Sequence, residues 1–123
     1  MPSQKVLVID DDEAYGRSLA RAMEERGFEA RALPNGESAL KLVESYVPDV
    51  VLCDLVMPVM DGYELCAELR LKPELSDTLF VAHTGWGLKS GEKKSVCFDH
   101  HIEKPLDLDR LQSFIDAHGA TRH

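Results

Sequence analysis

The sequence predicts a single α/β domain in which a parallel, five-stranded sheet is covered by helices on both faces. Short apolar runs rich in β-branched residues alternate with longer amphipathic segments along all 123 residues, as strands and helices do in such folds. A polar side chain follows the apolar runs directly, where the ligand-binding edge of a parallel sheet lies. Because no linker, repeat or low-complexity tract interrupts the pattern, we expect residues 1–123 to form one domain.

The first half of the chain opens with a strand, a helix and a second strand. Residues 6–9 form an unbroken apolar run, typical of a strand buried on both faces, which stops at Asp10. Apolar residues then recur at helical spacing over 13–26, and Gly27 follows where a helix would terminate. The signal at 29–32 is weaker but favours a second strand.

The second half repeats this alternation. A helix with apolar positions as far as Val47 is expected to end before Pro48, because the residue before a proline disfavours helical geometry. The remaining expected elements are strands at 50–53, 79–82 and 101–103, a helix around 65–69, a shortened fourth helix at 88–96 that contains Gly91, and a last helix from Leu108 with Asp107 as its N-cap.

Composition excludes several classes of function. The net charge of -8 argues against direct nucleic-acid binding, which needs clustered Lys and Arg, and no apolar run approaches the length of a membrane span. The three cysteines (Cys53, Cys66 and Cys97) lack CxxC spacing, so we expect reduced packing residues and no zinc site. The short N-terminal apolar run ends in aspartates, unlike a signal peptide. We therefore expect a cytoplasmic protein without membrane or nucleic-acid partners.

Four strand ends carry polar side chains whose chemistry is coherent: Asp10 and Asp11, then Asp54, Thr84 and Lys104. The carboxyl ends of parallel strands meet at one edge of the sheet, so these side chains should converge there. Carboxylate oxygens that also face a phosphate suit Mg²⁺, while an ammonium and a hydroxyl suit phosphoryl oxygens. The set predicts phosphoryl transfer to a carboxylate.

With these residues in place, the chain resembles the receiver domain of two-component signalling, as found in bacterial response regulators and hybrid sensor kinases. The resemblance implies a flavodoxin-like fold with strand order 2-1-3-4-5. It also implies that a phosphohistidine on a histidine kinase or histidine phosphotransfer protein is the donor, and that the switched surface signals to a downstream protein that the sequence does not name. The matching segments are 6–11, 49–58, 60–62, 84–85 and 104–105.

The resemblance also implies the acceptor and its metal. Asp54 would accept the phosphoryl group. Asp11, Asp54 and the backbone carbonyl of Val56 would hold Mg²⁺, with Asp10 acting mainly through a bound water. The domain would catalyse only its own phosphorylation and dephosphorylation, so we do not expect an enzyme in the usual sense.

Three further residues receive roles from the same resemblance. Lys104 would pair with Asp54 and then with the phosphoryl group, on a backbone placed by a cis peptide to Pro105. Thr84 would hydrogen-bond a phosphoryl oxygen, and Gly85 would leave room for the donor.

The output side departs from the family pattern. His101 stands where receivers often carry Tyr or Phe as a switch coupled to Thr84, and a histidine there could make the output pH-sensitive. Thr84 and Lys104 lie 20 positions apart, about two fewer than we expect, and Cys97 replaces a typical glycine. A metal shared by His100 and His101 is disfavoured, because adjacent strand residues point to opposite faces.

Two alternative functions remain open at this stage. One is a Mg²⁺-dependent phosphohydrolase of the haloacid-dehalogenase type, although that family needs a second Asp two residues after the nucleophile, where this chain has Val56. The other is a receiver-fold scaffold that is not phosphorylated.

Overall fold

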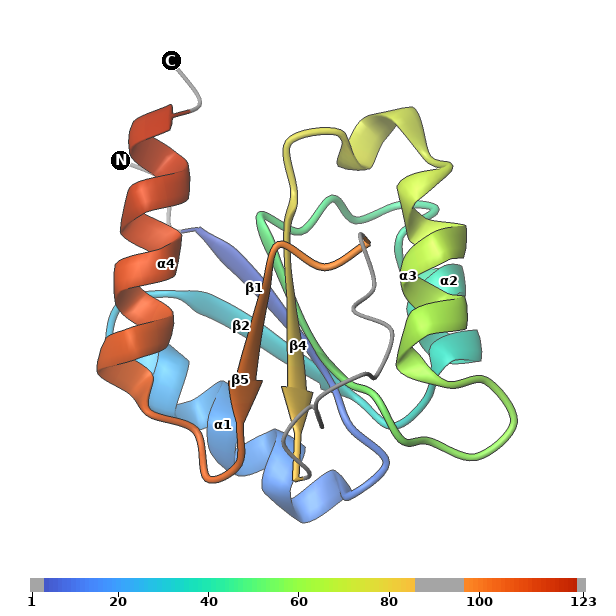
Figure 1. Ribbon diagram of the computed structural model, residues 1–123, viewed down its shortest axis with the longest axis horizontal. Coiled ribbons are helices and arrows are strands. Elements are labelled where there is room, and N and C mark those ends of the chain that lie inside the picture. The colour runs from blue at the N-terminus through green and yellow to red at the C-terminus, as the bar shows by residue number, and fades with distance from the viewer. Residues whose placement is uncertain (1–3, 86–96, 122–123) are drawn as a thin grey trace, which may run out of the picture.

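The computed structural model describes residues 4–85 and 97–121, and these form one parallel sheet flanked by helices (Figure 1). The sheet order is β2-β1-β3-β4-β5 with every neighbouring pair parallel, which confirms the order that the resemblance implied. The strands are β1 (Lys5–Ile9), β2 (Glu29–Leu33), β3 (Val50–Asp54), β4 (Leu79–Thr84) and β5 (His100–Glu103).

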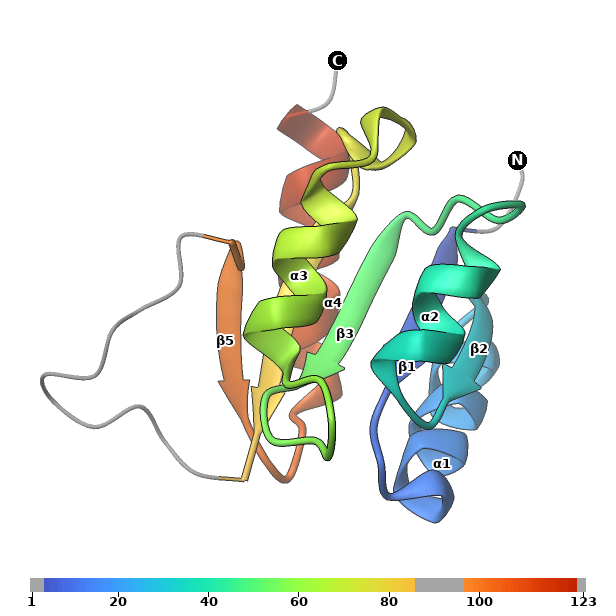
Figure 2. The ribbon, with the colours of Figure 1, turned by 90° about the vertical axis from the view of Figure 1, so that its right-hand side faces the viewer.

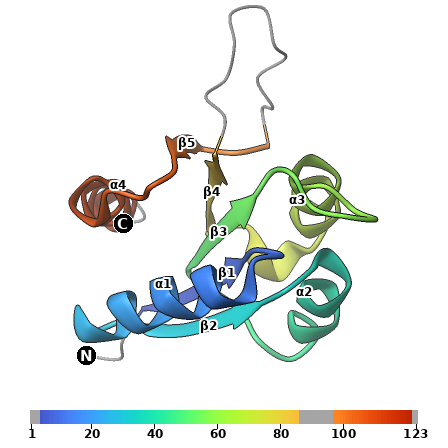
Figure 3. The ribbon, with the colours of Figure 1, turned by 90° about the horizontal axis from the view of Figure 1, so that it is seen from below.

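Helices cover both faces of this sheet, as Figures 2 and 3 show. They are α1 (Glu13–Glu25), α2 (Gly36–Leu42), α3 (Gly62–Arg70) and α4 (Leu108–Thr121), with a short 3₁₀ turn at Pro73–Leu75. The label α4 thus denotes the last helix of the chain. The expected fourth helix at 88–96 lies outside the described residues.

The core is split by the sheet into two apolar layers, because successive strand residues face opposite sides. On β1, Val6 and Val8 pack with α1 and α4, whereas Leu7 and Ile9 pack with α2 and α3. All four side chains are at most 1% exposed, which explains the unbroken apolar run of this strand.

Helix starts follow the expected capping chemistry. Asp12, Asn35 and Asp61 accept hydrogen bonds from backbone N–H groups in the first turns of α1, α2 and α3. Asp61 also forms a capping box with Glu64. The predicted N-cap of the last helix is confirmed, because Asp107 Oδ1 accepts from two backbone N–H groups of that helix.

The second helix is shorter than the sequence pattern predicts. It ends at Leu42 rather than before Pro48, and Val47, which we expected on its apolar face, is 45% exposed. Residues 43–45 leave the helix in a turn, and Tyr46 takes the buried position instead. The aromatic ring fills more of the space beneath the turn than a valine could, and Lys5 and Arg31 lie over it.

All five strands extend by one or two residues beyond their predicted ranges. β4 continues through His83 to Thr84, and both residues are buried, so these polar side chains belong to the sheet and not to the loop after it. β5 begins one residue early, at His100.

All three cysteines are free thiols, with Cys53 and Cys66 buried and Cys97 partly buried. In the part of the chain that the structure describes, no helix is long and apolar enough to span a bilayer.

Candidate functional site

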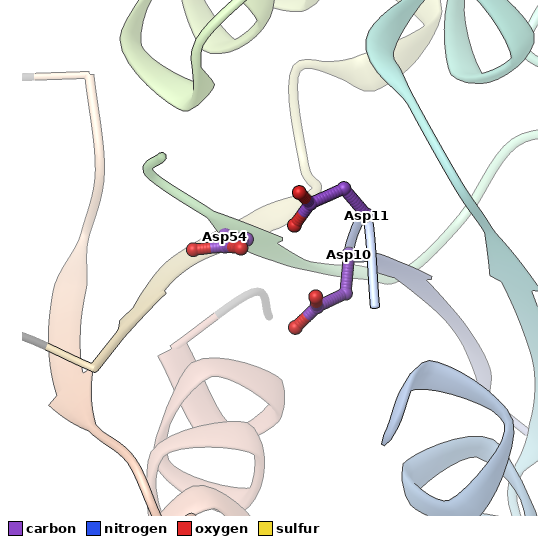
Figure 4. Close-up of side chains that lie close together, drawn as sticks. All are labelled: Asp10, Asp11 and Asp54. Carbon is purple, nitrogen blue, oxygen red and sulfur yellow. The ribbon is translucent and has the colours of Figure 1, made fainter. Parts of the chain in front are cut away.

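Three carboxylates converge at the carboxyl edge of the sheet. Asp10 and Asp11 follow β1, and Asp54 is the last residue of the neighbouring β3 (Figure 4). One carboxylate oxygen from each residue lies within 4.8 Å of the other two. Asp10 and Asp54 are buried whereas Asp11 is exposed, so the cluster opens to solvent on one side only.

Burial makes the charge on Asp54 costly. Loss of water around the carboxylate raises its pKa, Lys104 opposes this rise, and the charge of Asp10 adds to it; the net pKa is about 6. Asp54 Oδ1 accepts a hydrogen bond of 3.3 Å from the backbone N–H of Val56. A carboxylate held in this state gains strongly from any further positive charge brought close to it.

Lys104 supplies one such charge from the end of β5. Its Nζ lies 2.9 Å from Asp10 Oδ2 and 3.6 Å from Asp54 Oδ2. Burial lowers the Lys104 pKa, but the hydrogen bond to Asp10 and the charge of Asp54 outweigh it, so the net pKa is raised. Its backbone N–H donates to Thr84 O at 2.7 Å, and the peptide to Pro105 is cis, as the resemblance implied.

Thr84 and Gly85 lie on the adjacent strand end. The register pairs Asp54 with His83, so Thr84 stands one residue further along the edge, 3% exposed. Gly85 is exposed, and a Cβ added there would come within 4.0 Å of Lys104 Cδ. Residue 85 therefore lies next to the aliphatic part of the Lys104 side chain. A larger side chain here would narrow the approach from solvent to Lys104.

His100 and His101 point to opposite faces of β5, as the alternation of strand residues predicted. His100 stacks on Phe114 of α4 at 3.7 Å between ring centroids, while His101 meets Phe98 edge-on at 5.8 Å. Because the register pairs His101 with Ala82, its side chain lies on the same face of the sheet as Thr84, which is two residues further along β4 than Ala82. The placement is compatible with the predicted switch position.

The loop after β3 returns to lie against Asp54 at Gly62. Gly62 is not among the residues with positive φ, so backbone freedom is not the reason for a glycine here. It is required for close approach instead: a Cβ there would lie 2.5 Å from the Asp54 carbonyl oxygen and 2.9 Å from Leu55 Cα. The helix α3 can therefore begin directly against the end of β3.

Val59, in the same loop, takes the left-handed conformation with φ of 72° although its side chain is fully exposed. A β-branched residue rarely adopts this geometry, and strain of this kind concentrates beside functional sites. Met57 and Met60 pack against the core cluster on this side, as expected.

Two residues near the site received no role from the sequence. His83 lies one residue beyond the strand predicted at 79–82 and Tyr15 lies within the helix predicted over 13–26, yet the Tyr15 hydroxyl lies 3.2 Å from His83 Nε2. The Lys104 ammonium lies 4.9 Å from the centroid of the Tyr15 ring. The alternation of β4 residues could have indicated that His83 faces the same side as Leu79 and Val81, which pack in the layer next to α1.

The carboxylate cluster fits a hard divalent cation. Its ligand atoms are all oxygens, two of the three carboxylates are buried, and only one ammonium offsets their charge at close range among the described residues. Val56, whose backbone carbonyl the resemblance implied as a further ligand, follows Asp54 by two residues, and its N–H donates to Asp54 Oδ1.

Comparison with known proteins agrees with this geometry. A model of the response regulator receiver domain matches residues 6–116. The response regulator MprA of Mycolicibacterium vanbaalenii is 41% identical over 113 residues, which cover 87% of this chain and 46% of that protein. The regulatory protein AtoC of Escherichia coli is 34% identical over 112 residues, covering 90% of this chain and 24% of that protein. The chain thus spans about half or less of the length of these relatives.

Solved structures with the same fold extend over nearly the whole chain. A CheY-like response regulator receiver domain from Methylobacillus flagellatus superposes with a TM-score of 0.85 at 29% identity, covering 95% of this chain and 99% of that one. The response regulator TrrA of Thermotoga maritima, solved in complex with Mg²⁺–BeF, gives a TM-score of 0.81 at 28% identity, with 94% and 98% coverage.

Proposed function

The chain belongs to the response regulator receiver domain family, a signalling family of two-component pathways, and we propose that Asp54 is its phosphoryl acceptor. The observation that supports this assignment is the difference between the hydrogen bonds made by the Asp10 and Asp54 carboxylates. Asp10 Oδ1 accepts from the Asp12 N–H and its Oδ2 from Lys104, so both of its oxygens are engaged. Asp54 is buried and both of its contacts are longer than the 2.9 Å contacts of Asp10: Oδ1 lies 3.3 Å from the Val56 nitrogen and Oδ2 lies 3.6 Å from Lys104 Nζ. It is the carboxylate best placed to act as a nucleophile.

The proposed transfer forms one bond and breaks one. An Asp54 carboxylate oxygen attacks the phosphorus of a phosphohistidine, and the P–N bond of the donor breaks. Its electron pair stays on the imidazole nitrogen, which takes up a proton from water. Lys104 neutralises charge on the phosphoryl oxygens, and the rigid end of β3 holds Asp54 for in-line attack.

The proposed cofactor is Mg²⁺, held by Asp10, Asp11, Asp54 and the Val56 carbonyl. When bound, it supplies positive charge to the transferring phosphoryl group and to the carboxylates. The Mg²⁺–BeF complex of TrrA supports this proposal, because the similarity to TrrA covers 94% of the present chain.

We also propose the phosphoryl donor, the residues that pass on the signal, and the place where the domain acts. The donor is a histidine kinase or histidine phosphotransfer protein, and the only catalysis is self-phosphorylation and subsequent hydrolysis of the aspartyl phosphate. Thr84 and His101 would couple the phosphoryl group to the output surface, with Gly85 leaving space for the donor. We propose one receiver domain over 1–123, acting in the cytoplasm on a downstream protein and not directly on nucleic acid or membrane.

A phosphohydrolase of the haloacid-dehalogenase type is disfavoured by the position two residues after Asp54. Val56 is 65% exposed there and has no group that can protonate a leaving oxygen. We therefore expect the protein not to hydrolyse p-nitrophenyl phosphate, a substrate that a phosphohydrolase of this type would turn over.

The acceptor assignment is tested by treating the protein with acetyl phosphate and Mg²⁺ and measuring intact mass. We expect one phosphoryl adduct on the wild type and none on Asp54→Asn. Asp77→Asn, which changes an exposed carboxylate at the opposite edge of the sheet, is the matched control and should behave as wild type. An equal adduct on Asp54→Asn, or none on the wild type, would refute the assignment.

A further inference from the structure

His83 is a buried polar group that the proposed chemistry does not use. It is 1% exposed, and the alternation of β4 places it on the α1 side of the sheet, opposite to its neighbour Thr84. A buried imidazole nitrogen is costly unless it is hydrogen-bonded. Its Nε2 lies 3.2 Å from the hydroxyl oxygen of Tyr15, a residue of the first turn of α1.

The direction of this hydrogen bond follows from the second partner of the phenol. The backbone N–H of Leu106 donates to the Tyr15 hydroxyl oxygen at 3.4 Å, so the phenol proton is free to be donated to His83 Nε2. The acceptor must then be a neutral imidazole protonated on Nδ1. Burial, assisted by the charge of Lys104, lowers the pKa of His83 to about 4, which agrees with that state. One phenol thus ties α1, β4 and the loop after β5 together.

The ring of the same tyrosine lies against the ammonium of Lys104. The Lys104 Nζ is 4.9 Å from the ring centroid, within the range of a cation–π contact, while it reaches Asp10 at 2.9 Å and Asp54 at 3.6 Å. A lysine side chain has several rotatable bonds and loses much freedom when it is held in one geometry. The aromatic face gives the ammonium a contact besides the two carboxylates, which restricts that freedom, and the bond to Leu106 fixes the backbone two residues after the lysine.

We infer that Tyr15 and His83 are positioning residues for phosphoryl transfer: His83 anchors the Tyr15 hydroxyl, and the Tyr15 ring holds the Lys104 ammonium toward Asp10 and Asp54. The inference rests on the proposed role of Lys104 at the phosphoryl group. It predicts that the pair acts on the rate of Asp54 phosphorylation through Lys104 and has no effect without it.

The experiment measures the rate of phosphorylation by acetyl phosphate at saturating Mg²⁺, followed by intact mass. Tyr15→Phe keeps the ring and removes the hydroxyl, and it should slow the reaction by about two- to fivefold; Tyr15→Leu, which also removes the aromatic face, should slow it by about five- to tenfold. His83→Gln offers an amide oxygen as acceptor and should retain most of the rate, whereas His83→Leu should match Tyr15→Phe.

A double-mutant cycle separates positioning from a merely structural role. In a Lys104→Met background, Tyr15→Phe should leave the remaining rate unchanged. Thr78→Val is the control for lost stability, because the Thr78 hydroxyl donates to the Pro48 carbonyl at 2.7 Å at the opposite edge of the sheet; it should destabilise the fold without changing the rate.

Failures of the two proposals give different results. If Lys104→Met slows phosphorylation but Tyr15→Phe does not, the positioning inference is wrong and the proposed site stands. An equal slowing by Tyr15→Phe with and without Lys104 also overturns the inference. If Lys104→Met itself reacts at the wild-type rate, the proposed role of the lysine fails, and the inference fails with it.

Discussion

Replacement of Asp54 by asparagine should stabilise the fold in the absence of metal. The carboxylate is 6% exposed, and burial is the first cause that raises its pKa to about 6. Ionised Asp54 is therefore less favourable in the folded protein than in the unfolded chain, where its pKa is about 3.9. Asparagine keeps the shape and hydrogen-bonding capacity of the side chain but has no charge to desolvate.

The magnitude and its pH dependence follow from proton linkage. Because the folded state has the higher pKa, it binds more protons than the unfolded state between about pH 4 and pH 6, so wild-type stability falls as the pH rises through this window. Each pKa unit between the folded and unfolded states corresponds to about 1.4 kcal/mol, and the Asp54 pKa differs by roughly two units between them. We expect Asp54→Asn to be more stable than the wild type by about 2–3 kcal/mol near pH 7, and by much less near pH 4.

Urea denaturation in chelator-containing buffer measures this difference. A gain of about 2–3 kcal/mol moves the urea midpoint upward by about 1 M for a domain of ordinary m-value. Asp77→Asn, an exposed change, should shift stability by no more than about 0.5 kcal/mol. Added Mg²⁺ should narrow the gap, because it binds the folded wild type preferentially. An Asp54→Asn variant that is no more stable near pH 7, or a gain independent of pH, would contradict the reasoning.

Three further substitutions test the geometry around the site. Gly62→Ala should lower the free energy of unfolding by about 1–3 kcal/mol and slow phosphorylation, because its Cβ would lie 2.5 Å from the Asp54 carbonyl oxygen. Gly119→Ala is the control, because no atom lies within 4 Å of the new Cβ. It should raise the urea midpoint. Val59→Gly should stabilise the fold by about 0.5–1 kcal/mol by relieving left-handed strain, and an unchanged or lower midpoint would count against that strain. Asp61→Ala should cost about 1 kcal/mol through loss of the capping box, measured in the same assay, where no loss would show the cap to be dispensable.

Much of the fold could be predicted from the sequence because β1 and β3 are buried on both faces. Such strands appear as unbroken apolar runs, and helices must cover both faces of the sheet that they form. The end of α2 was not readable, because the helical spacing of Val43 and Val47 continues past the point where Tyr46 enters the core. Local periodicity describes which face is apolar, but the competition between neighbouring side chains for one buried position is a tertiary effect.

The residues of the candidate site could be predicted from the sequence for a different reason. Strand-end carboxylates and a strand-end lysine meet at one edge whatever the details of packing, so their convergence follows from topology. His83 was missed because a polar residue after an apolar run resembles a strand end, whereas in the structure β4 continues past it and the side chain is buried. The left-handed Val59 had no signal at all, since its side-chain chemistry disfavours the conformation that the loop imposes.

The central claim is that the phosphoryl group resides on Asp54, and chemical localisation tests it most directly. The protein is treated with acetyl phosphate and Mg²⁺, reduced with borohydride to convert the acyl phosphate to homoserine, digested, and sequenced by tandem mass spectrometry. We expect homoserine at position 54 and unmodified aspartate at Asp10 and Asp11. Homoserine at either of those positions, or at neither of them nor at 54 despite a phosphoryl adduct in the intact protein, would contradict it.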